Sequence, residues 1–216
     1  MRLRITFSKS GALRYTGHLD LHTIWERTVR RAGLPLTYSN GFHPGPKIQL
    51  ASALPLGFIG RREIVDLWLD GSQADPSAHP YEQILQLAAP PGLGIVSVEP
   101  VDEHSPALQT QVTSAEYELT LLDPLGGSDL AERVAAVLEA DSLPRERRGK
   151  QYDLRPLIEG LSLLPADASG TIRLCMRLAA RDGATGRPEA VLEALGISSE
   201  STRIERTCLI LKEGIK

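Results

Sequence analysis

The segment Arg2-Leu-Arg-Ile-Thr-Phe7 and the stretch from Thr16 to Ala32 that follows it decide the fold of this chain. In the first segment every second residue is apolar, which predicts a half-buried strand. In the second, apolar residues recur at helical spacing, which predicts an amphipathic helix that Thr16 caps and that buries Ile24, Trp25 and Val29 against the sheet. Gly33 and Pro35 end this helix, because glycine closes helices and proline cannot continue them.

Working outward from this pair, the sequence predicts the element order β-α-β-β-α-β twice. The first set comprises the strand 2–7, the helix 16–32, strands at 34–38 and within 47–69, the helix 81–88 and the strand 95–101. A polar linker, 102–114, precedes the second set, which comprises the strand 116–122, the helix 128–140, strands within 152–164 and at 171–179, the helix 188–195 and the strand 203–212. This order predicts an α+β protein of two tandem ferredoxin-like halves with antiparallel sheets, residues 1–103 and 114–216.

The composition is that of a globular protein, since 42% of the 216 residues are hydrophobic and 24% are charged. The longest stretch without a charged residue, 83–98, has 16 residues and contains Pro90-Pro91, so we expect no membrane-spanning helix. The N-terminal residues alternate charged and apolar side chains, unlike a secretory signal. Two cysteines cannot frame a disulfide scaffold, and we expect a cytoplasmic protein.

The charges are divided unevenly along the chain. Residues 1–62 hold ten Lys and Arg against two Asp and Glu, a net charge of +8. Residues 63–216 hold fourteen against twenty-five, a net charge of −11. A basic segment joined to an acidic remainder suits a chain that presents one face to a polyanion, although basic residues clustered on a solvated helix would give the same count.

The first helix carries His18, Asp20, His22 and Glu26 near its start. The i, i+4, i+8 spacing places the two histidines and Glu26 on one stripe, which could bind a metal or act in acid–base catalysis. The alternative, which we favour for a metal, is a solvated helix face on which Asp20 interacts with the positive helix end. We therefore expect no metal, and His18 and Asp20 remain candidate catalytic residues.

The Gly/Pro-rich loop 39–47 is the second candidate site. Its stiff backbone, with His43 and Lys47 beside it, suits a phosphate group, and Phe42 could stack on a base. The alternative is a rigid connection with Phe42 in the core. His43 is the third candidate catalytic residue, and we expect it to flank one phosphate or catalytic centre together with His18.

Most of the basic residues of the first half are arginines, whose planar guanidinium groups bind phosphate through two hydrogen bonds. We expect them to converge on one exposed face. The candidate nucleic-acid contacts are Arg14, His18, Arg27, Arg30, Arg31, Phe42, His43 and Lys47, with Arg61 nearby.

Several motifs also resemble a known family. They are Leu13-Arg-Tyr-Thr-Gly-His-Leu-Asp-Leu21, Tyr38-Ser-Asn-Gly-Phe-His-Pro-Gly-Pro-Lys47, Leu54-Pro-Leu-Gly57 and Tyr152-Asp-Leu-Arg-Pro156. They are similar to the radical SAM-linked family, a bacterial domain of unknown function that is fused to, or encoded beside, cobalamin-binding radical S-adenosylmethionine proteins. The resemblance implies a radical SAM protein as partner. This chain departs from the family at Thr16-Gly17, where a bulkier residue and serine are usual.

Three functions are compatible with these observations. The first is a non-catalytic RNA-binding module that serves a radical SAM enzyme in tRNA or rRNA modification or processing. The second is a metal-independent endoribonuclease, by fold-level analogy with CRISPR repeat-associated RNA-binding proteins. The third is an accessory domain that binds only protein. No Cys-x-x-x-Cys-x-x-Cys motif is present to hold an iron–sulfur cluster, so we expect no cofactor in this chain.

Overall fold

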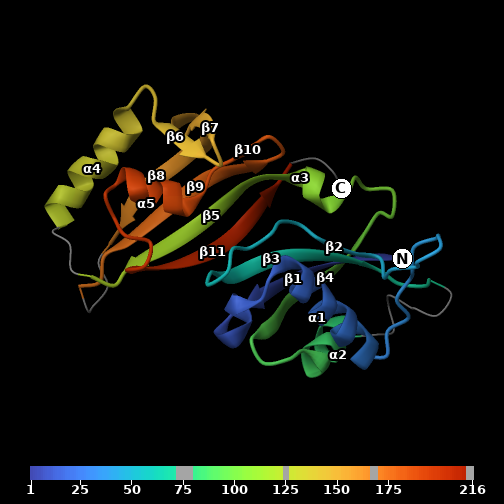
Figure 1. Ribbon diagram of the computed structural model, residues 1–216. Helices are drawn as coiled ribbons and strands as arrows, with labels where there is room; N and C mark the ends of the chain where they lie inside the picture. The colour runs from blue at the N-terminus through green and yellow to red at the C-terminus, as the bar shows by residue number, and fades with distance from the viewer. Residues whose placement is uncertain (72–79, 124–126, 166–169, 213–216) are drawn as a thin grey trace. The chain divides into compact units, whose positions relative to one another are not determined.

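The computed structural model describes residues 1–71, 80–123, 127–165 and 170–212 (Figure 1). The chain forms two compact units, one of Met1–Val112 with Leu211 and Lys212, and one of Thr113–Ile210. Both units combine helices with antiparallel strands, so the protein has a mixed α+β fold. Within the described ranges, no helix has the length and apolar character needed to cross a membrane.

The first unit is a four-stranded antiparallel sheet with two main helices. Its elements are β1 (Arg2–Lys9), η1 (Gly11–Tyr15), α1 (His18–Arg31), β2 (Ile48–Leu50), β3 (Ile59–Trp68), α2 (Tyr81–Ala88), β4 (Leu93–Val101) and α3 (Leu108–Gln111). The strands lie in the order β2-β3-β1-β4, and each neighbouring pair is antiparallel. Helices α1 and α2 lie on one face of this sheet (Figure 1).

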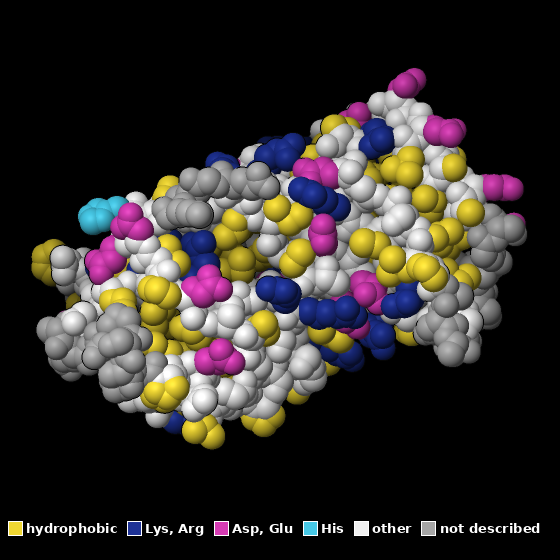
Figure 2. Space-filling view, turned by 180° about the vertical axis from the view of Figure 1, so that it is seen from behind, with side chains coloured by type: hydrophobic (Ala, Val, Ile, Leu, Met, Phe, Trp, Pro, Cys, Tyr) yellow, Lys and Arg dark blue, Asp and Glu magenta, His cyan; other side chains and the backbone are white. Residues whose placement is uncertain are grey.

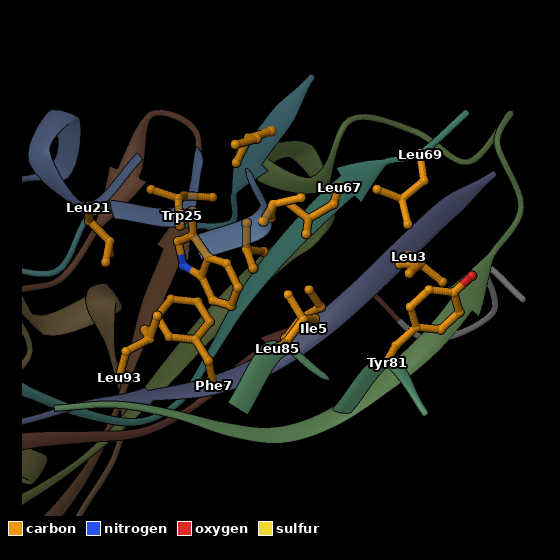
Figure 3. Packing of buried hydrophobic residues seen from close by; sticks show 14 residues of the cluster. Leu3, Ile5, Phe7, Leu21, Trp25, Leu67, Leu69, Tyr81, Leu85 and Leu93 are labelled. Carbon is orange, nitrogen blue, oxygen red and sulfur yellow. The ribbon is translucent and has the colours of Figure 1, made fainter. Parts of the chain in front are cut away.

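The core of the first unit lies between these helices and the sheet. The apolar side chains of β1 all point into it, as the alternation in the sequence predicts (Figure 3). Trp25 of α1 is fully buried and meets Phe7 edge to face, with ring centroids 5.0 Å apart. Val29 is buried as expected, whereas Ile24 is only partly buried. The packing of this helix stripe against β1 fixes the direction of α1 across the sheet.

The start of α1 and the second strand differ from the sequence prediction. Gly17 is the N-cap, and the Thr16 hydroxyl instead donates to the carbonyl of Leu13 at 2.7 Å. No strand forms at 34–38, where the described structure has isolated bridges; strand β2 lies at 48–50. The physical reason is that Pro35 and Pro46 lack the backbone N–H that a continuous ladder needs.

The polar face of β1 is not solvated at its first residue. Arg2 is buried and forms an ion pair with buried Asp66 of β3. Its guanidinium also donates to the carbonyl oxygens of Ser105 (2.6 Å) and Pro106 (3.0 Å). The segment expected as a linker therefore covers this end of the sheet and includes α3, whose Leu108 is fully buried.

The second unit has a similar sheet and an additional hairpin. Its elements are β5 (Val112–Leu121), α4 (Gly127–Glu139), β6 (Pro144–Arg147), β7 (Lys150–Asp153), η2 (Arg155–Leu157), β8 (Ile158–Leu164), β9 (Arg173–Arg181), β10 (Ala184–Thr185), α5 (Pro188–Ala194) and β11 (Thr202–Leu211). Strands β8 and β10 both pair with β9, and the order continues β9-β5-β11. Strands β6 and β7 form a separate two-stranded sheet.

The segment between α4 and β8 differs from the predicted element order. The basic run 145–150 forms the turn and the flanking strands of the additional β6–β7 hairpin. The strand expected within 152–164 is interrupted by η2, because Pro156 cannot donate to a ladder. Arg155 donates to the backbone carbonyl oxygens of Leu138 (2.9 Å) and Ile158 (3.1 Å), so its role is structural.

Candidate nucleic-acid interface

The first group of candidate residues surrounds the start of α1. We call this group, Arg14, Tyr15, His18, Leu19 and His22, the helix-start surface. Helix η1 delivers Arg14 and Tyr15, and the Arg14 guanidinium lies over the Tyr15 ring at 4.6 Å and hydrogen-bonds its hydroxyl. Tyr15 and Leu19 are exposed large side chains. The surface combines a cation, an aromatic ring and two histidines.

His18 is the exposed histidine of this surface. Partial desolvation of its ring, together with the nearby His22 and Lys9, lowers its pKa below the ordinary value of 6.5. Lys9 is itself buried, and its ammonium donates to the carbonyl of Thr16 at 2.8 Å. At pH 7 His18 is therefore neutral, so it can accept a proton or a hydrogen bond.

The carboxylates of α1 have structural partners. Asp20 accepts a hydrogen bond from the backbone N–H of Gly17 at 3.3 Å and so caps the helix. Glu26 forms an ion pair with Arg30 at 2.7 Å, one turn along the helix. In the part of the chain that the structure describes, no group of three His, Cys, Asp or Glu side chains could hold a metal ion. These contacts assign Asp20 and Glu26 to helix stability.

The second group lies on residues 38–47, which we call the aromatic loop. The Ser39 N–H donates to the carbonyl of Gly45 (2.8 Å), and the Gly45 N–H donates to the Ser39 hydroxyl (3.0 Å). Tyr38 forms a bridge with Pro46, and the Lys47 N–H donates to the carbonyl of Thr37 at 2.8 Å. These bonds close the loop at its base.

Phe42 lies within the closed part of this loop and is fully exposed, with a relative accessibility of 103%. The alternative that placed Phe42 in the core is therefore wrong. His43 and Lys47 are also exposed. Tyr38 is exposed and accepts a hydrogen bond from Arg30 at 3.4 Å. Two aromatic rings thus lie on one short loop with cations beside them.

The structure places the helix-start surface and the aromatic loop at opposite ends of α1. Lys9, at the end of β1, binds Thr16 just before the helix. The carbonyl oxygen of Lys47 instead accepts a hydrogen bond from the backbone N–H of Trp68. Trp68 lies opposite Arg2, at the start of β1, in the register of the two strands. Helix α1 has 14 residues, or about 20 Å at a rise of about 1.5 Å per residue.

This placement overturns the expectation of a shared centre for His18 and His43. The two histidines belong to different ends of the unit because α1 runs back along β1 and the chain enters the loop only after the helix ends. The basic residues therefore do not converge on one patch. They divide between Arg14 with His18 at one end and Arg30, His43 and Lys47 at the other.

The other two candidate arginines differ from each other. Arg31 donates to the carbonyl of Ala88, the last residue of α2, at 2.7 Å. A cation there satisfies a terminal carbonyl and the negative helix end, which makes Arg31 structural. Arg27 is exposed, and among the described residues it has no polar partner for its guanidinium. Arg61 has a partner of its own.

Sequence reasoning missed both tyrosines of these surfaces. Tyr15 follows Arg14 directly, and Tyr38 is the last residue of the segment 34–38 that reads as a strand. A strand would have placed Tyr38 on a sheet face, whereas the proline-bounded loop exposes it. The adjacent Arg-Tyr pair is a signal that could have identified Tyr15, because arginine stacks readily on aromatic rings.

A family model described as an uncharacterized protein conserved in bacteria (DUF2344) matches residues 2–188. The chain belongs to this family. No curated protein matches the DUF2344 chain.

Among solved structures, the DUF2344 chain is similar to one in a Cbf5-Nop10-Gar1 complex, with a TM-score of 0.52 and 10% identity over 98% of this chain and 50% of that chain. It also matches an archaeal box H/ACA sRNP Nop10-Cbf5 complex (TM-score 0.47, 11% identity, 98% and 49% coverage). A third match is an H/ACA RNP bound to a substrate RNA containing 2'-deoxyuridine (TM-score 0.46, 9% identity, covering 95% of this chain and 46% of that chain). The chain spans about half the length of these structures, and the first match shows a shared fold.

Proposed function

We propose that this DUF2344 protein is a non-catalytic module that binds single-stranded RNA through its aromatic loop. The observation that carries the proposal is the complete exposure of Phe42 on a closed loop. An aromatic ring held in solvent buries no apolar surface within the chain, so folding does not explain it. Such a ring can stack on a nucleobase, and stacking is possible with any base because every base has a flat aromatic face.

The cations around this loop supply the second requirement of an RNA site. Lys47 is exposed and lies at the base of the loop, and His43, which follows Phe42 directly, adds an exposed hydrogen-bonding ring beside these cations. Arg30 reaches the loop through the Tyr38 hydroxyl. Stacking on rings beside a cationic track is the usual way in which proteins bind single strands without reading their sequence. The likeness to the Cbf5-Nop10-Gar1 structure supports the fold alone, so the proposal rests on the loop.

We further propose that each unit is a ferredoxin-like half. The first unit has the order β2-β3-β1-β4, and its elements follow one another as βαββαβ. In the second unit β8, β9, β5 and β11 lie in the corresponding order, with the β6–β7 hairpin and β10 as additions. This arrangement is also the basis for the analogy with CRISPR repeat-associated proteins.

The proposed partner is a radical SAM enzyme that modifies or processes tRNA or rRNA, as the family resemblance implies. This chain has no cysteine motif for an iron–sulfur cluster, so the chemistry would belong to the partner. In this role the DUF2344 chain holds the RNA in the cytoplasm while the partner acts on it. The acidic second half is the part proposed to dock the partner.

An endoribonuclease is the second candidate function, and one observation favours it. His18 is exposed, is neutral at pH 7 and lies beside Arg14 and Tyr15. A neutral imidazole can take a proton from a ribose hydroxyl. Cleavage of RNA in the presence of EDTA that is lost in His18→Ala would establish this activity.

The binding proposal is tested by fluorescence anisotropy with a labelled single-stranded RNA and the full chain. Phe42→Ala should weaken binding by about 5- to 150-fold, since one stacked base contributes about 1–3 kcal/mol. Leu122→Ala, which removes another exposed apolar side chain in the second unit, is the matched control and should bind as the wild type does. Unchanged RNA binding by Phe42→Ala would refute the proposal.

The salt dependence gives a separate readout for the cations. Lys47→Gln should weaken binding to all sequences and reduce the slope of log K against log salt concentration by about 0.7, one counterion for a single strand. His104→Gln, which alters an exposed histidine outside the aromatic loop, is the control and should leave the slope unchanged. An unaltered slope in Lys47→Gln would remove this residue from the interface.

A further inference from the structure

The β6–β7 hairpin of the second unit borders a cavity of about 600 Å³ that none of the functions above uses. Four of its lining residues are basic: Arg147, Arg148, Lys150 and Arg187. Tyr152 and Asp153 line it as well. We call this cavity the cationic pocket. Its volume falls within the range of pockets that hold small ligands, about 300–1,000 Å³.

The basic side chains of the pocket have no polar partners among the described residues. The arginines on the sheet of the same unit are different. Arg173 pairs with Glu118, and both Arg177 and Arg181 pair with Glu159. Figure 2 likewise shows Lys and Arg side chains interspersed with Asp and Glu. The pocket thus gathers four basic side chains that have no ion-pair partner in the described part of the chain.

The hairpin register brings two of these cations directly opposite each other. Arg147 pairs with Lys150 across the turn. Like charges at directly opposite positions destabilise an antiparallel pair. An anion bound between them would turn this repulsion into attraction, so the register favours a negatively charged ligand.

The turn between these two residues carries an unfavourable backbone conformation. Arg148 has φ 50°, and it is the one residue other than glycine with positive φ in the described chain. Gly149 follows with φ 75°, so the turn needs two left-handed residues. Asn or Gly is preferred at the first of these positions, because a longer side chain is disfavoured there. Arg148 therefore occupies this position at a conformational cost, and its side chain lines the pocket.

Among the described residues that line the pocket, Asp153 is the one carboxylate, and backbone N–H groups bind it. Its Oδ1 accepts hydrogen bonds from the N–H groups of Leu143 (2.8 Å) and Arg155 (2.9 Å). These two bonds lower the pKa of Asp153, so it stays ionised and holds the base of the hairpin. Four cations against one carboxylate leave the lining with three positive charges in excess.

We propose that the cationic pocket binds a nucleotide that carries a 5′-phosphate, either free or at the end of an RNA strand. The four cations would hold the phosphate, with arginine binding it through two hydrogen bonds. Tyr152 supplies the aromatic face on which the base would stack. This inference concerns the second unit only, and it is independent of the aromatic loop.

The direct test is isothermal titration calorimetry of the full chain with adenosine 5′-monophosphate and with adenosine. Adenosine 5′-monophosphate should bind, and adenosine should bind at least about tenfold more weakly, because hydrogen bonds to a charged phosphate are lost. A pair of RNA oligonucleotides, identical except for a 5′-phosphate or a 5′-hydroxyl, identifies the source. Preference for the 5′-phosphate end supports the site on RNA, and binding of the mononucleotide alone supports a free nucleotide. Failure of both phosphorylated probes to bind would overturn the proposal.

Arg148→Gly is the most informative variant. It removes a cation and places glycine where the backbone has positive φ, so the melting temperature should stay the same or rise. Affinity for adenosine 5′-monophosphate should nevertheless fall about tenfold. Arg203→Gln, which removes a paired cation on β11, is the control and should leave affinity unchanged. Unchanged affinity in Arg148→Gly would overturn the site.

The two proposals can fail separately. Phe42→Ala should leave the binding of adenosine 5′-monophosphate unchanged, because Phe42 does not line the cationic pocket. If Phe42→Ala binds RNA normally but Arg148→Gly loses the mononucleotide, the pocket stands and the aromatic-loop proposal does not.

Discussion

Replacing Asp66 with asparagine should destabilise the first unit by about 3–5 kcal/mol. The change keeps the shape of the side chain and removes one buried negative charge. Asp66 is 0% exposed and Arg2 is 1% exposed, so neither group can exchange its partner for water. Removing one member of a buried ion pair leaves the other charge uncompensated, which costs about 3–5 kcal/mol.

The contacts of Asp66 support this magnitude. Arg2 donates to it from Nε (3.0 Å) and Nη2 (2.6 Å), and Arg4 donates from Nε (2.9 Å) and Nη2 (3.0 Å). Without the carboxylate charge, Arg2 keeps two backbone carbonyl oxygens and the Trp68 ring at 4.7 Å. These groups are dipoles or a quadrupole and cannot balance a full positive charge in a dry site.

The assay is urea unfolding followed by tryptophan fluorescence. Both tryptophans of the chain, Trp25 and Trp68, lie in the first unit, so the signal reports that unit alone. Glu26→Gln is the control, because the ion pair of half-buried Glu26 with exposed Arg30 lies within one helical turn at the surface. It should cost no more than about 0.5 kcal/mol. A loss below about 1 kcal/mol in Asp66→Asn would refute the assignment of a buried charge pair.

Two further outcomes are expected from the same unfolding assay. Gly92→Ala should cost more than about 2 kcal/mol, since its φ of +92° disfavours alanine by about 1–2 kcal/mol and a Cβ would lie 2.5 Å from the carbonyl oxygen of Ser10. Gly57→Ala, at φ +85° with open space around it, should lower the free energy of unfolding only by the cost of the backbone conformation. An equal loss of stability in Gly57→Ala and Gly92→Ala would contradict the close approach at Gly92. Because the pKa of His18 is lower in the folded protein, the unfolded chain binds this proton at a higher pH than the folded chain does. The contribution of His18 to the free energy of unfolding should therefore be fully present above about pH 6.5 and be lost as the pH falls below that value. Between pH 8 and pH 5.5, His18→Gln should therefore lose less stability than the wild type, and an equal loss in the two proteins would show that His18 does not contribute.

Local sequence patterns determined the elements whose formation depends on near neighbours. The alternation of β1 and the apolar stripe of α1 predicted a strand and a helix that pack together, with Trp25 in the core. The helix predicted at 188–195 is α5, which has Pro188 at its first position and the positive-φ Gly196 just after its end. Such patterns work because side-chain periodicity selects which face of a helix or strand can be buried.

The candidate site depended on contacts between segments that are distant in the sequence. The pattern of β1 marked Arg2 as a polar residue on the open face, yet segment 105–111 covers that face and Asp66 neutralises the charge. The direction of α1 across the sheet separated His18 from the aromatic loop by the length of the helix. The cationic pocket exists because the β6–β7 hairpin brings its turn close to Arg187. The sequence by itself determined which residues were available for such sites, and only tertiary packing decided which of them meet, because burial, charge compensation and chain direction are properties of the assembled fold.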